Sequence, residues 1–431
     1  MFAWATAKTP LPTLRRHAND ESSRMTTDLS PTPRKAAFAF VFVTVLLDML
    51  ALGMVIPVLP KLIESFLSGD TARASEFVGL FATVWALMQF VFSPVQGALS
   101  DRFGRRPVIL ISNFGLGLDY VVMALAPNLI WLFAGRVISG ICAASISTSF
   151  AYIADVTAPE RRSARFGMLG AAFGVGFVVG PAVGGVLGSI DPRLPFWAAA
   201  GFSLLNGLYG LLVLPESLPI EKRAPLSWRR ANPVGSLMLL LTHRELYGLA
   251  AANFLAQMAH VALPTTFVLY AGYRYGWGER AVGFTLALVG ACAVVVQGGL
   301  VGRFVKHFGE RRTLVIGLLF GAIGFAVYGV APTGWLFCVG VPVMALWGLA
   351  SPTAGGLMSK RVSATEQGQL QGANSSVQGI ANLVAPVIFA LLFAYAIGAG
   401  RGWGLPGAPF LLAAILLVAA AGLAWHVTRP R

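Results

Sequence analysis

Long apolar runs separated by short polar connections dominate this 431-residue chain. Each run has about 20 residues, the length that an α-helix needs to cross a hydrocarbon layer roughly 30 Å thick. Continuous apolarity does not fit the alternation of a barrel strand, and a helix satisfies its own backbone hydrogen bonds in lipid. The pattern predicts an all-α membrane protein with twelve transmembrane helices. The expected spans are 36–59, 76–99, 107–126, 128–150, 165–188, 194–214, 245–271, 279–302, 313–331, 335–358, 369–396 and 405–427.

Composition and charge agree with this pattern. Hydrophobic residues make up 56% of the chain and charged residues only 12%, against about 25% charged residues in a soluble domain. Lys and Arg gather in alternate connections, so the positive-inside rule places both termini in the cytoplasm. The net charge of +14 therefore indicates contact with anionic lipid, and no nucleic acid or obligate protein partner is expected.

The ends of the chain and its cysteines carry little chemistry. The first 35 residues are polar and lack an apolar signal-peptide core, and the pattern leaves Met1 and Met25 as alternative hypotheses for the start of translation. Cys142, Cys292 and Cys338 lie inside predicted spans without metal-ligand spacing and are interpreted as packing residues. The expected segments are a disordered cytoplasmic segment at 1–35, a six-helix bundle at 36–214, a cytoplasmic linker with a candidate interfacial helix at 215–244, a second bundle at 245–427 and a cytoplasmic tail at 428–431.

An internal repeat relates the two predicted bundles. One constant offset of 205 residues brings glycine, proline, phenylalanine and arginine landmarks into register. The matched pairs are Gly97 and Gly302, Phe103 and Phe308, Gly104 and Gly309, Arg106 and Arg311, Pro127 and Pro332, Gly167 and Gly372, and Pro181 and Pro386. The repeat predicts two pseudo-symmetric halves that arose by duplication.

A concentration of charge stands out in the connection GALSDRFGRRPVIL at 97–110. As a plain topological turn, it would use Gly104 for the bend and Pro107 to begin a helix, while the arginines hold it inside. That interpretation leaves Asp101 unexplained. An acid beside arginines at a helix junction favours ion pairs that form in one conformation and break in another.

This connection resembles the loop motif between the second and third helices of the major facilitator superfamily, and the resemblance extends over 36–427. It implies two six-helix bundles, alternating access, and a loop that locks the halves together at the cytoplasmic side. The matching gate residues are Gly97, Asp101, Arg102, Gly104, Arg105 and Arg106, with Asp155 as the expected partner. Four stretches resemble one branch of this superfamily more specifically, the tetracycline/proton antiporters. They are LLDMLALGMVIPVLP at 46–60, WALMQFVFSPVQGALSDRFGRRPVIL at 85–110, LDYVVMALAP at 118–127 and FGMLGAAFGVGFVVGPAVGG at 166–185.

Small residues form a strip in the predicted fifth helix. Glycines at this spacing allow helices to pack closely in a membrane. The strip also resembles the antiporter motif of the superfamily, where a closely packed helix seals the resting transporter. Its residues are Gly176, Gly180, Pro181, Gly184 and Gly185.

Three charges lie well inside predicted spans, namely Asp48, Asp119 and Arg136. Each costs about 2.5–3.5 kcal/mol on insertion scales, and helix rise places all three roughly in one layer near the midplane. A structural ion pair is one explanation. However, one arginine cannot neutralise two aspartates, so the second acid is expected to bind and release a proton, with Arg136 tuning that exchange. The family resemblance implies the same role and adds Gln89, a matching polar residue.

The second half departs from the tetracycline antiporters. Positions that hold an aspartate and a histidine in that branch align here with Gly321 and Ala293. Polar residues in the predicted spans of this half either tie helices together or contact substrate. The candidate substrate contacts are Asn253, Gln257, His260, Gln297, Asn374 and Gln378.

These patterns favour a secondary transporter that exports an amphiphilic, tetracycline-like drug in exchange for protons across a bacterial inner membrane. An exporter of another drug or metabolite is the alternative, and a membrane enzyme or lipid-handling protein is a remote one, because no P-loop or catalytic motif is present. No cofactor is expected, since the proton gradient supplies the energy, although the substrate could carry a divalent metal.

Overall fold

The computed structural model of the chain describes residues 31–143, 145–224, 243, 246–363 and 366–429. Within these ranges the protein is helical and contains no β-strand. The predicted interfacial helix and most of the disordered N-terminal segment lie outside the described residues, as does Met25.

The helices of the two halves follow one another in chain order. The first half contains α1 (Pro31–Val55), α2 (Leu59–Phe66), α3 (Thr71–Phe103), α4 (Arg105–Leu125), α5 (Leu129–Cys142), α6 (Ser145–Val156), α7 (Pro159–Gly188) and α8 (Leu194–Val213), followed by the short η1 (Ile220–Lys222). The second half contains α10 (Tyr247–Tyr275), α11 (Glu279–Val295), η4 (Val296–Leu300), α12 (Val301–Val330), α13 (Gly334–Ala345), η5 (Leu346–Leu349), α14 (Ala350–Ser359), α15 (Gln367–Ile397), η6 (Arg401–Trp403) and α16 (Ala408–Val427).

Within the described ranges, 11 helical stretches are long and apolar enough to span a membrane. One of them, Glu279–Val330, has 52 residues, and a straight helix of that length would extend roughly 78 Å, more than twice the hydrocarbon core. Gly309 interrupts this stretch with φ 75° and ψ 163°. The stretch therefore crosses twice, and the twelve predicted crossings are present.

Helix ends differ from the predicted spans in a consistent way. The span predicted at 36–59 corresponds to one membrane-length stretch, Phe38–Phe66, in which α1 ends at Val55 and α2 begins at Leu59. Other helices extend past their apolar runs; α7 begins at Pro159 and α3 continues to Phe103. Hydrophobicity marks the segment within lipid, whereas a helix continues into its polar flanks while its backbone remains hydrogen-bonded.

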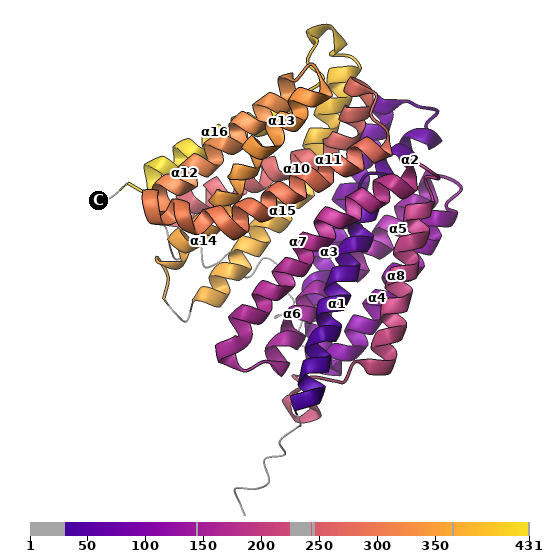
Figure 1. The fold of residues 1–431 in the computed structure, drawn as a ribbon, viewed down its shortest axis with the longest axis vertical. Helices are drawn as coiled ribbons and strands as arrows, with labels where there is room; N and C mark the ends of the chain where they lie inside the picture. Colours follow the sequence, from indigo (N-terminus) through magenta and orange to yellow (C-terminus); the bar gives the residue numbers. More distant parts are fainter. Residues whose placement is uncertain (1–30, 144, 225–242, 244–245, 364–365, 430–431) are drawn as a thin grey trace, which may run out of the picture.

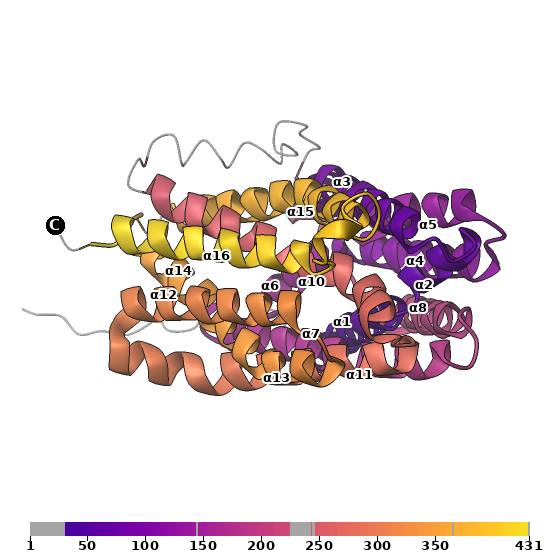
Figure 2. The same ribbon diagram turned by 90° about the horizontal axis from the view of Figure 1, so that it is seen from above.

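The two halves lie side by side and meet along two helix pairs (Figures 1 and 2). Contacts between the halves are made mainly by α3 with α15 and by α7 with α11. At the end that holds α2, Ser75 Oγ donates a hydrogen bond to the carbonyl of Ala390 at 2.9 Å. At the opposite end, an added Cβ at Gly97 or Gly302 would meet nothing within 4 Å. The halves thus converge at one end and diverge at the end where α1 begins and α16 finishes (Figure 1).

The repeat offset found in the sequence also holds for backbone conformation. Gly104, at φ 105° and ψ 161°, matches Gly309 in its left-handed φ. Ion pairs follow the same offset with their charges reversed. Arg105 Nε lies 3.2 Å from Asp155 Oδ2, and at the equivalent positions Lys360 Nζ lies 2.8 Å from Glu310 Oε2.

The glycine strip of α7 allows close approach on two faces. On one face Gly176, Gly180 and Gly184 face α1; the Cα of Gly53 would lie 2.8 Å from a Cβ added to Gly180. On the other face Gly185 meets Gly283 of α11, whose Cα would lie 2.9 Å from a Cβ at position 185. The strip is therefore a packing surface, as predicted, and its sealing role stays a prediction.

Substitution Gly184→Val tests this packing. A side chain at this position would collide with the backbone of Met54, so we expect a loss of about 1–3 kcal/mol of stability and a lower Tm in detergent. The matched control is Gly170→Val on the same helix, where an added Cβ meets nothing within 4 Å. Equal Tm values for the two variants would contradict the assignment.

Candidate functional site

The three predicted intramembrane charges surround one tyrosine in the first half. Asp48 lies on α1, Asp119 on α4 and Arg136 on α5, and their exposed fractions are 8%, 0% and 8%. All three charges act electrostatically on Tyr120, which is buried next to Asp119. The structure therefore brings the three charges into one electrostatic neighbourhood, and their common depth in the membrane stays a prediction.

Arg136 interacts with one of the two aspartates and with an aromatic ring. Its guanidinium carbon lies 5.3 Å from the ring centroid of Trp85, and its charge acts on Asp119. Asp48 has no cationic partner among the described residues, and its Oδ1 accepts no hydrogen bond from them. The arrangement leaves one acid near a cation and one acid alone, as expected if one arginine serves two aspartates. Gln89 lies one turn along α3 from Trp85.

Buried amides near these charges were missed by the sequence analysis. Thr44 Oγ1 of α1 donates a hydrogen bond to Asn206 Oδ1 of α8 at 3.1 Å. Asn113 of α4 is fully buried, and neither polar atom of its side chain has a protein partner in the described structure. The available signal was an amide inside an apolar run, the same signal that selected the second-half candidates.

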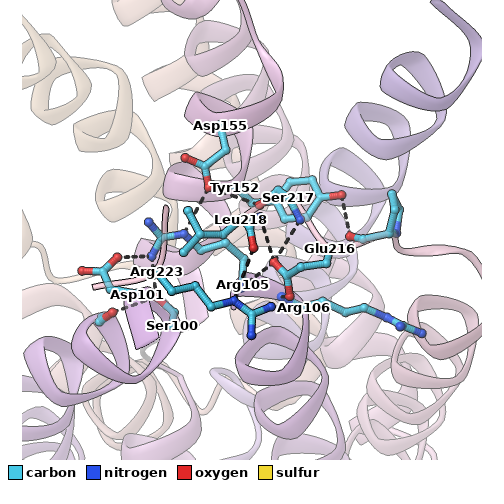
Figure 3. Close-up of polar contacts among 12 residues, drawn as sticks. Ser100, Asp101, Arg105, Arg106, Tyr152, Asp155, Glu216, Ser217, Leu218 and Arg223 are labelled. Carbon is cyan, nitrogen blue, oxygen red and sulfur yellow. Dashed lines mark hydrogen bonds and ion pairs between the residues drawn. The ribbon is translucent and has the colours of Figure 1, made fainter. Parts of the chain in front are cut away.

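The loop motif forms a dense polar cluster (Figure 3). Arg105 is its centre, because its side chain pairs with Asp101 and Asp155 and donates to Ser100 Oγ at 2.6 Å. Asp155 also accepts a hydrogen bond from Ser217 Oγ at 3.2 Å. The predicted partnership between Arg105 and Asp155 is thus present in the structure.

Glu216 was not predicted, yet it anchors this loop. Its carboxylate accepts hydrogen bonds from the backbone N–H groups of Arg105 at 2.9 Å and Arg106 at 3.2 Å, the first residues of α4. An acid at a helix N-terminus satisfies unpaired donors and complements the helix dipole. A side chain at Gly104 would collide with this carboxylate. The signal in the sequence was an acid directly after the sixth span.

These loop contacts stay within the first half in this conformation. Arg106 Nη2 donates to the carbonyl of Leu211 at 2.7 Å, and the Arg102 guanidinium lies 5.2 Å from the ring of Phe103. Gly97 has open space around its Cα. A lock between the halves stays a prediction for the opposite conformation.

Several second-half candidates line one cavity of about 540 Å³ between α10, α14 and α15. Asn253 and Gln257 come from α10, and Asn374 and Gln378 come from α15. The sequence analysis missed the other polar lining residues, which are Ser351, Ser359, Gln367, Gln371 and Ser375.

The two remaining candidates lie elsewhere in this half. Gln297 belongs to the π-helical stretch η4 and packs near Gly348, and His260 lies 5.4 Å from the ring of Trp347. Trp347 also packs against Gly321, the position that the family resemblance aligns with an aspartate, since a Cβ at Gly321 would lie 2.8 Å from Trp347 Cγ. An aspartate does not fit at position 321 without rearrangement.

An acid at the entry to α15 is held in its charged form. Glu366 Oε2 accepts hydrogen bonds from Ser363 Oγ at 2.6 Å and from Ser363 N at 3.0 Å, and Glu366 Oε1 lies 3.0 Å from His243 Nε2. The hydroxyl of Ser363 and then His243 lower the pKa of Glu366 to about 2. Glu366 therefore remains an anion at any physiological pH and ties the start of α15 to His243, four residues before the start of α10.

Twelve crossings in two pseudo-symmetric halves are the architecture of secondary transporters. The chain belongs to the Major Facilitator Superfamily, whose family model it matches over residues 41–386. It is 36% identical to the class C tetracycline resistance protein of Escherichia coli, over 81% of this chain and 88% of that protein. It is 32% identical to the class H tetracycline resistance protein of Pasteurella multocida, over 90% of this chain and 96% of that protein. As expected, these relatives are transporters and not enzymes.

Solved structures support the fold. The human organic anion transporter MFSD10 matches with a TM-score of 0.66 and 26% identity, over 91% of this chain and 99% of that chain. A variant of the nucleoside transporter NupG matches with a TM-score of 0.74 and 13% identity, over 91% of this chain and 100% of that chain. At such low identity, the NupG match supports the fold alone.

Substitution Glu216→Ala tests the loop anchor. Losing the carboxylate leaves the first N–H groups of α4 unpaired, so we expect a loss of about 1–2 kcal/mol of stability and a lower Tm. Glu221→Ala, an exposed acid of η1, is the control and should leave Tm unchanged. A Glu216→Ala protein as stable as the control would show that the cap contributes nothing.

Proposed function

We propose that this protein exports an amphiphilic, tetracycline-like drug in exchange for protons across a bacterial inner membrane. The carrying observation is that α1, α4 and α5 bring two buried aspartates and one arginine together around Tyr120. A buried acid without a cationic partner is the chemistry that proton binding needs. The relatives named as tetracycline resistance proteins favour the drug class.

The coupling roles follow from the unequal sharing of Arg136. The charge of Arg136 acts on Asp119, whereas Asp48 has no such partner. Asp48 therefore carries the exchangeable proton, and Asp119 transmits the protonation state of Asp48 through Arg136. Trp85 holds the guanidinium from the α3 side. A change of partner by Arg136 would then link protonation in the first half to the position of α3.

Alternating access is the transport mechanism that we propose. An even number of crossings supports placing both termini on one side of the membrane, and the density of arginines favours the cytoplasm for that side. The halves diverge on that side (Figure 1), so this conformation is open inward. In the outward-open state, the 101–106 loop would exchange partners and contact the second half.

Drug-induced proton release from energised inverted vesicles tests this function. We expect wild-type protein to release protons when tetracycline is added, and Asp48→Asn or Asp119→Asn to abolish the release at equal expression. Asp191→Asn, an exposed acid between α7 and α8, is the control and should behave as wild type.

Two results would redirect the proposal. Release by other amphiphiles but not by tetracycline would support the alternative of another drug or metabolite. Undiminished release from both intramembrane variants would remove Asp48 and Asp119 from the coupling mechanism.

A further inference from the structure

The cavity of the second half has an unusual lining for a site inside a membrane protein. Amide and hydroxyl groups from three helices face a space of about 540 Å³, within the range of pockets for drug-sized ligands. The amide-bearing residues are Asn253, Gln257, Gln367, Gln371, Asn374 and Gln378. Amides offer a donor and an acceptor side by side, so they can match keto, hydroxyl and carboxamide groups on one ligand.

Most of these amides are free to bind a ligand. Gln367 is engaged, because it exchanges hydrogen bonds with Ser359 at 2.8 and 2.9 Å. The other amides of the lining make no hydrogen bond to the described part of the protein. Polar groups that face a cavity without protein partners are positioned for ligand or water.

No charged side chain lines this cavity among the described residues. Two acids lie near the lining, and both are paired with other residues. Glu310, which lies near the lining residue Gly356, is bound to Lys360, and Glu366, next to Gln367, is bound to Ser363 and His243. A cationic ligand would therefore lose hydration on entry without gaining an anionic partner.

We infer that this amide-lined cavity is the substrate site, and that it takes a metal-free, polyoxygenated ring compound with no net positive charge. The inference rests on the proposed function and assigns substrate and proton to different halves. Gly379, next to Gln378, lies against Phe90 of α3, and an added Cβ there would be 2.9 Å from Phe90 Cε2. Helix α3 also carries Gln89 and Trp85, so it joins the cavity to Arg136.

Equilibrium binding to the purified full-length protein tests the site. The probes are tetracycline in EDTA, tetracycline with excess Mg²⁺, and the permanent cation tetraphenylphosphonium. We expect tetracycline to bind at least as well in EDTA as with Mg²⁺. The double variant Gln257→Leu/Asn374→Leu should bind it roughly tenfold or more weakly, since each neutral hydrogen bond contributes a several-fold factor. Gln369→Leu, on α15 but outside the lining, should bind as wild type.

A second variant tests the charge preference of the cavity and does not depend on whether the double variant folds. Gln378→Glu adds an anion to the cavity, so it should strengthen tetraphenylphosphonium binding at least several-fold relative to wild type. Unaltered tetracycline affinity in the folded double variant, a requirement for Mg²⁺, or no gain for the cation in Gln378→Glu would each overturn the inference. The proton-release assay separates the two proposals. If tetracycline releases protons but its binding does not depend on the amides, only this substrate site is ruled out. If its binding depends on the amides but no protons are released, only the antiport function is ruled out.

Discussion

Close approach of α7 to two neighbours is the constraint on which the rest of the structure depends. Lipid tails are as apolar as side chains, so helices in a membrane associate through direct packing and not through hydrophobic exclusion. Glycines remove the side chains that would separate α7 from α1 on one face and from α11 on the other. Gly176 contacts Met49, the residue after Asp48. One helix therefore positions an intramembrane acid and also forms part of the seam between the halves.

The two halves share a fold but differ in chemistry. The first half buries its charges around Tyr120, and the second half presents uncharged amides to a cavity. At position 321, which the family resemblance aligns with an acid, Trp347 and Leu417 occupy the space that a side chain would need. Loss of that acid is thus a packed arrangement and not an empty position. Helix α3, which contacts α15 as well as α5, is the element that adjoins both kinds of chemistry.

The sequence was sufficient for the topology because hydrophobic length and the repeat offset are properties of single segments and of their order. Helix rise likewise predicted a similar depth for Asp48, Asp119 and Arg136, because depth depends on position along a single segment. The sequence did not reveal that the ring of Trp85 would lie against the guanidinium of Arg136, or that Glu216 would cap α4. Those contacts depend on the rotation of each helix about its axis and on the path of a connection, which hydropathy does not encode.

The reversed ion pairs have a consequence for tracing the ancestry of the two halves. Arg105 with Asp155 and Glu310 with Lys360 occupy equivalent places, yet a residue-by-residue alignment of the halves scores two mismatches there. The contact is present in both halves, and its polarity can invert because a pair is neutral in either order. Divergence measured by residue identity therefore overstates the distance between the halves. Pairwise covariation would be the more faithful record of such a duplication.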